Sequence, residues 1–155
     1  IYADRQRHIH MSEQMEAILE YCRGKAELGI ITNGPSVHQW NKVKSLRAER
    51  WIPHENIFVS ADVGAEKPDR KIFECAERTM GLEEAAIWFV GDSYELDVKG
   101  AVNAGWNAVW MNRRKRKAPE GAMIVKHEHA GRIAGAETEE ALFGFVRMLL
   151  EGVTK

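Results

Sequence analysis

Two aspartates stand five residues apart just after a short apolar run, and they are the strongest chemical signal in this chain. The run Ile87–Val90 leads into Gly91 and Asp92, and Asp97 follows. A short apolar run that ends at glycine is typical of a buried strand in a parallel sheet, and open α/β sheets bind ligands at the carboxyl ends of their strands. Carboxylates at that edge suit Mg²⁺, which takes oxygen ligands together with substrate phosphate. The plainer interpretation is that Asp92 or Ser93 only caps the helix that follows.

A second apolar run ends in groups that can hold a phosphate. Leu28–Ile31 is followed by Thr32, Asn33 and Gly34. A hydroxyl and an amide offer hydrogen-bond donors, and glycine lets the backbone approach a ligand closely. Taken alone, the segment is more typical of an ordinary turn after a strand.

A lysine lies next to a predicted helix start. Pro68 fits the first position of a helix that reaches about Met80, which leaves Lys67 just outside the helix. An ammonium group there can balance anionic charge, although most single lysines are solvated on a surface. The order and spacing of the three segments, more than any one of them, indicate a shared phosphate site.

Strand-Thr-Asn-Gly, then Lys-Pro before a helix, then strand-Gly-Asp-x-x-x-x-Asp resembles the haloacid dehalogenase-like hydrolases. The resemblance covers roughly residues 12–113 and includes the Gly-Ala-Val-Asn-Ala-Gly-Trp segment at 100–106. Within the family the motifs look most like the capped small-molecule phosphatases, which include nucleotide monophosphatases. The resemblance therefore implies a small phosphorylated metabolite as substrate, for example a nucleoside monophosphate.

The resemblance also implies a role for each candidate residue. Four residues would bind the phosphoryl group: Thr32, Asn33, Gly34 and Lys67. Thr32 would supply the phosphate-binding hydroxyl, and Lys67 would stabilise the nucleophile and the transferring phosphoryl group. Asp92 would ligate Mg²⁺, and Asp97 would support the metal site through water or neighbouring groups. Thr32, Lys67 and Asp92 are thus the predicted catalytic residues.

The first motif of the family, an Asp-x-Asp pair after the first strand, has no counterpart before Thr32. Asp4 has no apolar run before it and no acid two residues later. We expect that an N-terminal piece with the first strand and a cap is absent from this chain, and that this chain alone is inactive. Residues 1–11 would then be the remnant of a cap or linker, and residues 12–155 one incomplete core domain. The alternative is a non-catalytic phosphate-binding module without a nucleophile.

The absent strand has a structural consequence. In the family fold it lies between the strands that here contain Ile30–Ile31 and Ile87–Val90. Its removal would leave two buried strand edges with unpaired backbone groups, which are costly when shielded from water. We therefore expect the gap to be filled by the missing segment, by a complementing chain or neighbouring molecule, or by a rearranged strand such as Ala122–Val125.

The reaction implied for the complete protein is phosphoryl transfer to a carboxylate, followed by hydrolysis of the aspartyl-phosphate. Haloacid dehalogenase activity is an alternative on the same fold, but dehalogenases typically carry serine where this chain has Asp92. Phosphomutases share all of these motifs and differ mainly in the cap, so this alternative stays open.

Alternating helical and strand patterns predict an α/β fold with a doubly wound, Rossmann-like parallel sheet. The predicted helices span residues 11–25, 36–48, 68–80, 96–104 and 136–152, and the predicted strands residues 28–32, 57–60, 87–90 and 107–111.

Composition agrees with a cytoplasmic enzyme that binds neither membranes nor nucleic acid. No apolar run approaches the ~20 residues that span a bilayer, and a formal charge of -1 does not favour a general nucleic-acid binder. Cys22 and Cys75 are too few for a disulfide framework, so we expect reduced thiols. The basic run Arg113–Lys117 follows a predicted strand; it is either a solvated loop or a patch that steers anionic substrates.

Overall fold

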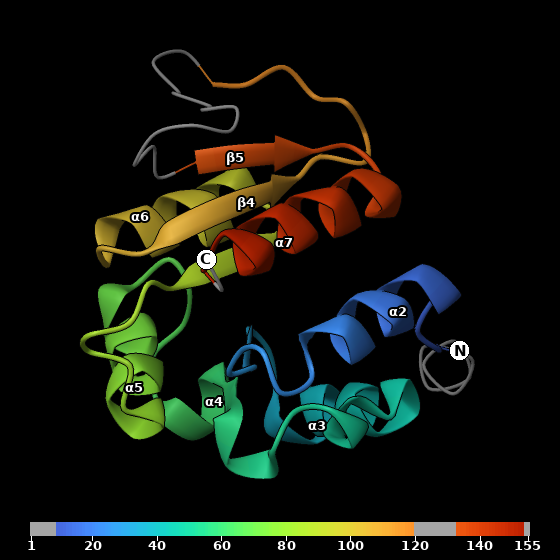
Figure 1. Cartoon of the computed structure of the whole chain (residues 1–155). Helices are drawn as coiled ribbons and strands as arrows, with labels where there is room; N and C mark the ends of the chain where they lie inside the picture. Colours follow the sequence, from blue (N-terminus) through green and yellow to red (C-terminus); the bar gives the residue numbers. More distant parts are fainter. Residues whose placement is uncertain (1–8, 120–132, 154–155) are drawn as a thin grey trace.

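The computed structural model describes residues 9–119 and 133–153, and it has parallel strands between layers of helices (Figure 1). The strands are β1 (Ile30–Thr32), β2 (Ile57–Val59), β3 (Trp88–Gly91), β4 (Asn107–Met111) and β5 (Ile133–Ala136). The α-helices are α2 (Glu13–Cys22), α3 (Ser36–Leu46), α4 (Ser60–Val63), α5 (Arg70–Met80), α6 (Lys99–Asn103) and α7 (Glu139–Val153). Short 3-10 turns at Ala48–Arg50 and His54–Asn56 and a π-helical turn, η3 (Tyr94–Val98), complete the described elements.

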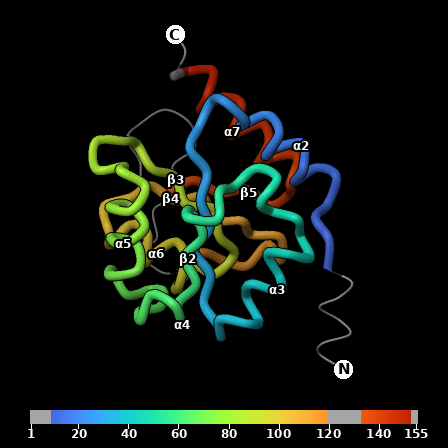
Figure 2. The backbone as a smooth tube through the Cα atoms, turned by 90° about the horizontal axis from the view of Figure 1, so that it is seen from below, coloured from blue at the N-terminus to red at the C-terminus, as the bar shows by residue number. Residues whose placement is uncertain are grey.

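Helices cover both faces of the β3-β4-β5 sheet, as a doubly wound fold requires. Side chains of β4 alternate between the two faces, with Ala108 and Trp110 in the core beneath α5 and α6, and Val109 and Met111 in the core beneath α2 and α7. Figure 2 shows α2 beside α7, where the Tyr21 and Phe143 rings are 5.7 Å apart. The predicted α/β fold is therefore confirmed.

The strands form two separate parallel sheets. β1 pairs with β2 with Ile31 opposite Phe58, and β4 lies between β3 and β5. β5 was not predicted, because Ile133-Ala-Gly-Ala is short and rich in small residues and lacks the β-branched or aromatic pattern of a strand. It gives the second sheet a parallel edge strand just before α7.

β1 and β3 flank an apolar cavity of about 80 Å³. Its walls include Ile30 and Ile31 from one sheet, and Trp88 and Phe89 from the other. Within residues 9–119 and 133–153 no strand lies between β1 and β3, so the expected filling of the gap is not found there. The suggested filler Ala122–Val125 lies outside the described residues.

Helix α5 explains how the two sheets stay together. Its residues Ile72, Phe73 and Ala76 are buried in one core that also contains Ile31 of β1 and Ala108 of β4. This apolar face of α5 packs against both sheets, and burial of its apolar surface stabilises their association. The two sheets are therefore joined by a continuous apolar core, which α5 covers.

Helix α5 begins two residues later than predicted. Asp69 accepts a hydrogen bond from the Lys71 backbone N–H at 2.9 Å, which makes it the N-cap, and Arg70 is the first helical residue. Pro68 therefore precedes the helix and does not occupy its first turn. Lys67 and Pro68 belong to a loop whose position depends on tertiary contacts.

In the described part of the chain, no helix is both long and apolar enough to cross a membrane. The division into a remnant at 1–11 and a core at 12–155 remains a prediction, because residues 1–8 are not described.

Candidate functional site

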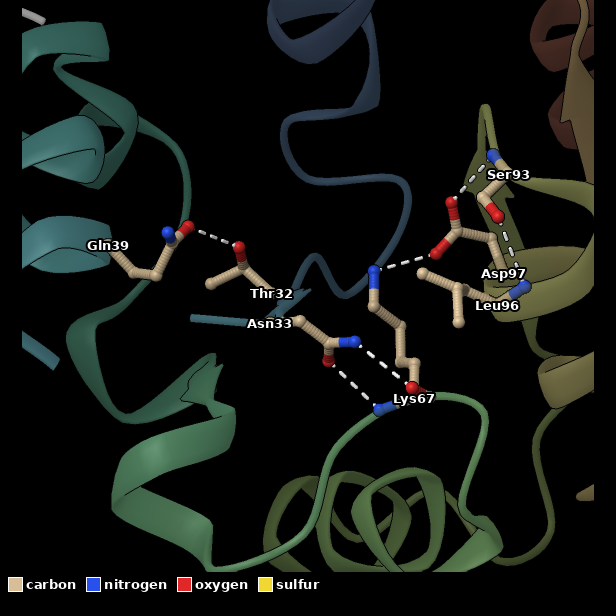
Figure 3. A network of polar contacts seen from close by, with 7 residues as sticks. All are labelled: Thr32, Asn33, Gln39, Lys67, Ser93, Leu96 and Asp97. Carbon is tan, nitrogen blue, oxygen red and sulfur yellow. Dashed lines mark hydrogen bonds and ion pairs between the residues drawn. The ribbon is translucent and has the colours of Figure 1, made fainter. Parts of the chain in front are cut away.

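Two loops that are far apart in the sequence are joined by the side chain of Asn33 (Figure 3). Its Nδ2 donates to the Lys67 carbonyl oxygen at 3.0 Å, and its Oδ1 accepts from the Lys67 backbone N–H at 2.9 Å. Both ends of the amide are therefore used to fix one residue. In the structure this side chain holds the Lys67 loop against the end of β1, and the predicted contact of Asn33 with phosphate stays a prediction.

The ammonium group of Lys67 forms an ion pair with Asp97. Lys67 Nζ lies 2.6 Å from Asp97 Oδ1, and the two side chains are only 12% and 7% exposed. Asp97 Oδ2 also accepts the Ser93 backbone N–H at 3.0 Å. In the structure its carboxylate neutralises and orients Lys67, and the predicted support of a metal site by Asp97 stays a prediction.

The position of Asp97 depends on Gly91. A side chain built at Gly91 would collide with the carboxylate group of Asp97, so only glycine leaves room for it below the end of β3. The π-helical turn η3 follows Ser93, which caps it by accepting the Leu96 N–H at 3.1 Å. This turn brings Asp97 back towards the strand, and such single-turn π segments are frequent at functional sites.

Thr32 ends β1, and its hydroxyl is engaged by Gln39 of helix α3 (Figure 3). Thr32 Oγ1 donates to Gln39 Oε1 at 2.6 Å. Gly34 was predicted to let the backbone approach phosphate. In the structure it packs against Gln39, because an added Cβ would lie 2.8 Å from Gln39 Cδ. The Ser60 hydroxyl fixes the same loop by accepting the Gly34 N–H at 2.8 Å.

Asp92 has an exposed side chain at the carboxyl end of β3. Its backbone oxygen accepts a hydrogen bond from Trp110 Nε1 at 3.1 Å, while its carboxylate has no hydrogen bond or ion pair within the described residues. An unengaged carboxylate at this edge suits a hard cation that keeps water and phosphate ligands. Residues 9–119 and 133–153 contain no group of three or more Asp, Glu, His or Cys side chains that could hold a metal ion. Of the two predicted metal-site carboxylates, Asp92 is thus the one left free to contact a cation.

The structure brings together most of the predicted residues. Asn33, Lys67 and Asp97 form one continuous chain of polar contacts between the ends of β1 and β3, and Thr32 adjoins Asn33 in the sequence (Figure 3). Gln39 and Ser60 were missed, whereas Ser93 had been named as a possible cap and caps η3 in the structure. Gln39 precedes Val43 by one helical turn on the buried face of α3, and a polar residue at such a position was the available signal.

Some residues of the basic run Arg113–Lys117, which follows β4, are engaged by other parts of the chain. Arg113 pairs with Glu139 at 3.0 Å, and the Arg116 backbone N–H donates to Asn112 Oδ1 at 3.0 Å. These contacts hold the loop near the start of α7. Its role in steering anions stays a prediction.

Asp62 of α4 links to α3 next to this site. Hydrogen bonds from Ser36 and Trp40 hold the pKa of the Asp62 carboxyl below its ordinary value, and the Trp40 Nε1–Oδ2 distance is 2.7 Å. A lowered folded pKa stabilises the fold above the unfolded pKa of about 3.9, and this stabilisation is lost as the pH falls through the folded pKa.

We therefore expect Asp62→Asn to lower the thermal midpoint at pH 7, with the difference from the unaltered protein shrinking towards pH 3. Melting curves across this range measure it. A difference that stays constant with pH would mean that ionisation of Asp62 does not contribute.

Comparison with known proteins follows the same motifs. A family model described as haloacid dehalogenase-like hydrolase matches residues 2–111. Pyrimidine 5'-nucleotidase YjjG of Escherichia coli (strain K12) is 35% identical over 68% of this chain and 46% of its own length. Glyceraldehyde 3-phosphate phosphatase of Methanothermobacter thermautotrophicus is 36% identical over 59% of this chain and 39% of its own length.

A solved structure agrees with the sequence comparisons. The crystal structure of a HAD phosphatase from Thermococcus onnurineus is similar with a TM-score of 0.72 and 28% identity, over 88% of this chain and 58% of that one. The chain spans less than half the length of the two curated relatives. On the match of the family model to most of its residues, the chain belongs to the haloacid dehalogenase-like hydrolases.

Proposed function

We propose that the protein containing this chain is a Mg²⁺-dependent phosphatase that hydrolyses a small phosphate monoester through an aspartyl-phosphate. The observation that carries the proposal is the placement of Lys67, fixed through its backbone by Asn33 and through its ammonium by Asp97 at one edge of the fold. A cation oriented in this way on a largely buried stem is suited to stabilise charge on a transferring phosphoryl group. Family membership supports the same chemistry.

Each of the three predicted catalytic residues has a defined part in this proposal. The Thr32 hydroxyl would donate to one phosphoryl oxygen, and Lys67 would lie beside another and beside the attacking carboxylate. Asp92 would hold the metal, and bound Mg²⁺ supplies charge neutralisation at the phosphoryl group. These groups act by positioning and electrostatics, which account for most of the catalysis of phosphoryl transfer.

The attacking aspartate would come from a segment outside this chain. A strand that pairs with both β1 and β3 would join the two parallel sheets into one, and an apolar side chain of it could enter the cavity beside them. Its carboxyl end would lie between the ends of β1 and β3, next to Lys67. We propose that this segment belongs to the N-terminal part of the same protein or to a complementing chain.

The substrate class follows from the relatives named above, which are a pyrimidine nucleotidase and a glyceraldehyde 3-phosphate phosphatase. Both names describe enzymes that act on small phosphate monoesters, and we propose a metabolite of this kind as substrate, including nucleoside monophosphates.

Cys22 and Cys75 are free thiols in the structure, in keeping with the proposed cytoplasmic location.

The test compares two proteins: this chain, and the same chain extended at its N-terminus by its encoded upstream segment. We expect the extended protein to hydrolyse p-nitrophenyl phosphate with Mg²⁺, to lose activity with a chelator and to regain it with added Mg²⁺. This chain alone should be inactive. Hydrolysis that the chelator leaves unchanged would contradict the metal dependence, and an extended protein that neither hydrolyses nor binds phosphate would contradict the whole proposal.

A further inference from the structure

Gln39 is a buried amide that contacts the proposed phosphate-binding hydroxyl directly. Its residue is 6% exposed, and its Oε1 accepts the Thr32 hydroxyl hydrogen at 2.6 Å (Figure 3). Among the described residues Gln39 Nε2 donates no hydrogen bond, and it is not one of the fully buried unpaired atoms, so solvent reaches it. Since Nε2 makes no hydrogen bond to the protein, it can change places with Oε1 without breaking one, and it is then available as a donor.

The hydrogen count at Thr32 shows that phosphate binding requires a different arrangement of the Gln39 amide. A hydroxyl has one hydrogen, and in the structure this hydrogen is directed at Gln39. Phosphoryl oxygens only accept, so Thr32 cannot hold a phosphoryl group until its hydrogen is released from Gln39. The oxygen of the hydroxyl then needs a donor in place of the acceptor it has lost.

We propose that Gln39 is a positioning residue that reverses its side-chain amide when a phosphoryl group binds. In the reversed state Nε2 donates to Thr32 Oγ1, and the hydroxyl hydrogen of Thr32 points to the phosphoryl oxygen. The inference rests on the proposed function and deepens it, since it explains how the phosphate-binding hydroxyl is turned towards a phosphoryl oxygen when phosphate binds.

The surroundings of Gln39 allow this exchange. The amide lies against the Cα of Gly34, and a Cβ at that position would lie 2.8 Å from Cδ and 2.9 Å from Cγ of Gln39. Gly34 has a φ of +146°, a conformation that favours glycine. Because the amide group is planar, turning it over exchanges oxygen and nitrogen at nearly the same two places, and the side chain does not have to leave its position.

Two substitutions separate the proposal from a merely structural role. Gln39→Glu keeps the shape and can still accept the hydroxyl hydrogen as in the structure, but as a carboxylate it cannot donate. Gln39→Leu keeps the volume but neither accepts nor donates, so the Thr32 hydroxyl can turn freely to a ligand. A structural role makes Gln39→Leu the more harmful change, whereas amide reversal makes Gln39→Glu the more harmful one.

The experiment measures KM for p-nitrophenyl phosphate and the inhibition constant of inorganic phosphate in the N-terminally extended protein. We expect Gln39→Glu to raise both by roughly 10- to 100-fold, the size of losing a hydrogen bond to a charged group, and Gln39→Leu by roughly tenfold or less. Lowering the pH should partly reverse the loss in Gln39→Glu, because a buried carboxyl has a raised pKa and donates once protonated. Gln14→Glu, an exposed change on α2, is the matched control.

A double-mutant cycle with Thr32→Val keeps the test decisive if one variant is unstable. With the hydroxyl removed, Gln39→Leu should weaken phosphate binding no further, since its effect passes through Thr32. The inference is overturned if Gln39→Glu binds phosphate as well as Gln39→Leu, or if the effect of Gln39→Leu persists without the hydroxyl. If the unaltered extended protein shows neither hydrolysis nor phosphate binding, the proposed function fails and this inference fails with it.

Discussion

Replacing Asp97 by alanine is expected to lower the free energy of unfolding by about 3–5 kcal/mol, the usual cost of removing one partner of a buried ion pair. The ammonium of Lys67 is 12% exposed by side chain and lies 2.6 Å from Asp97, so it would remain buried without a counter-charge. The Ser93 backbone N–H would lose its acceptor as well. Urea unfolding monitored by tryptophan fluorescence measures the change.

The chain offers a matched control for this prediction. Lys99 and Glu95 also form an ion pair, at 3.3 Å, but their side chains are 55% and 66% exposed. Exposed pairs contribute at most about 1 kcal/mol, so Glu95→Ala should change stability by no more than that. Adding Lys67→Met to Asp97→Ala should recover most of the lost stability, because the unpaired charge is then absent. Equal costs for Asp97→Ala and Glu95→Ala would show that burial of the pair has no special effect.

The sequence predicted those parts of the site that are encoded locally. Short apolar runs ending in Thr32 and in Gly91 identified two strands, and polar residues after strands were expected at a common sheet edge. In the structure the Asn33–Lys67 contacts and the Lys67–Asp97 ion pair join these loops at the carboxyl ends of β1 and β3, although the two strands belong to separate sheets. Parallel strands with intervening helices bring their carboxyl ends together for topological reasons, and topology can be read from a pattern of elements.

The sequence could not predict which polar atoms pair. Lys67 and Asp97 are 30 residues apart, and Asn33 and Lys67 are 34 apart. Their pairing depends on where α5 and η3 place each loop, which no local pattern encodes. For the same reason the residue types did not show that Lys67 engages Asn33 and Asp97 within the protein. A hydrogen-bonding side chain beside a site has two ways to be satisfied, by the ligand or by the protein, and the residue type does not distinguish them.

The two sheets of the described residues leave edges at which the proposed additional strand could pair. β1 and β3 each have one edge towards the same apolar cavity, and α5 keeps the sheets in place beneath it. Unpaired edges beside an apolar wall favour the addition of one extended segment, which would pair on both sides. The proposed strand would therefore supply two things at once, the sheet hydrogen bonds and the attacking carboxylate. This double role predicts that stability and activity rise together in the extended protein.

Asp92→Asn in the extended protein is expected to lower kcat/KM for a phosphate monoester by about 100- to 1000-fold, the range seen when one electrostatic group of a transition-state site is removed. The Asp92 side chain is exposed and its carboxylate has no partner within the described residues, so the loss should come without a change in stability. Asparagine keeps the size of the side chain and leaves the backbone bond to Trp110 in place. Steady-state hydrolysis at several Mg²⁺ concentrations, with melting curves of the same samples, measures both effects.

The contrast between Asp92 and Asp97 gives this last prediction its control. Asp97→Ala should lower the free energy of unfolding, because the Asp97 carboxylate is buried against Lys67. Asp92→Asn should lower the activity and leave the free energy of unfolding unchanged. Glu95→Gln removes an exposed acid three residues from Asp92 and should leave both quantities unchanged. A full rate with Asp92→Asn would place the metal on other ligands. A loss of rate that high Mg²⁺ restores would instead show that Asp92 contributes mainly to metal affinity, because saturating the site would then compensate for the weaker ligand.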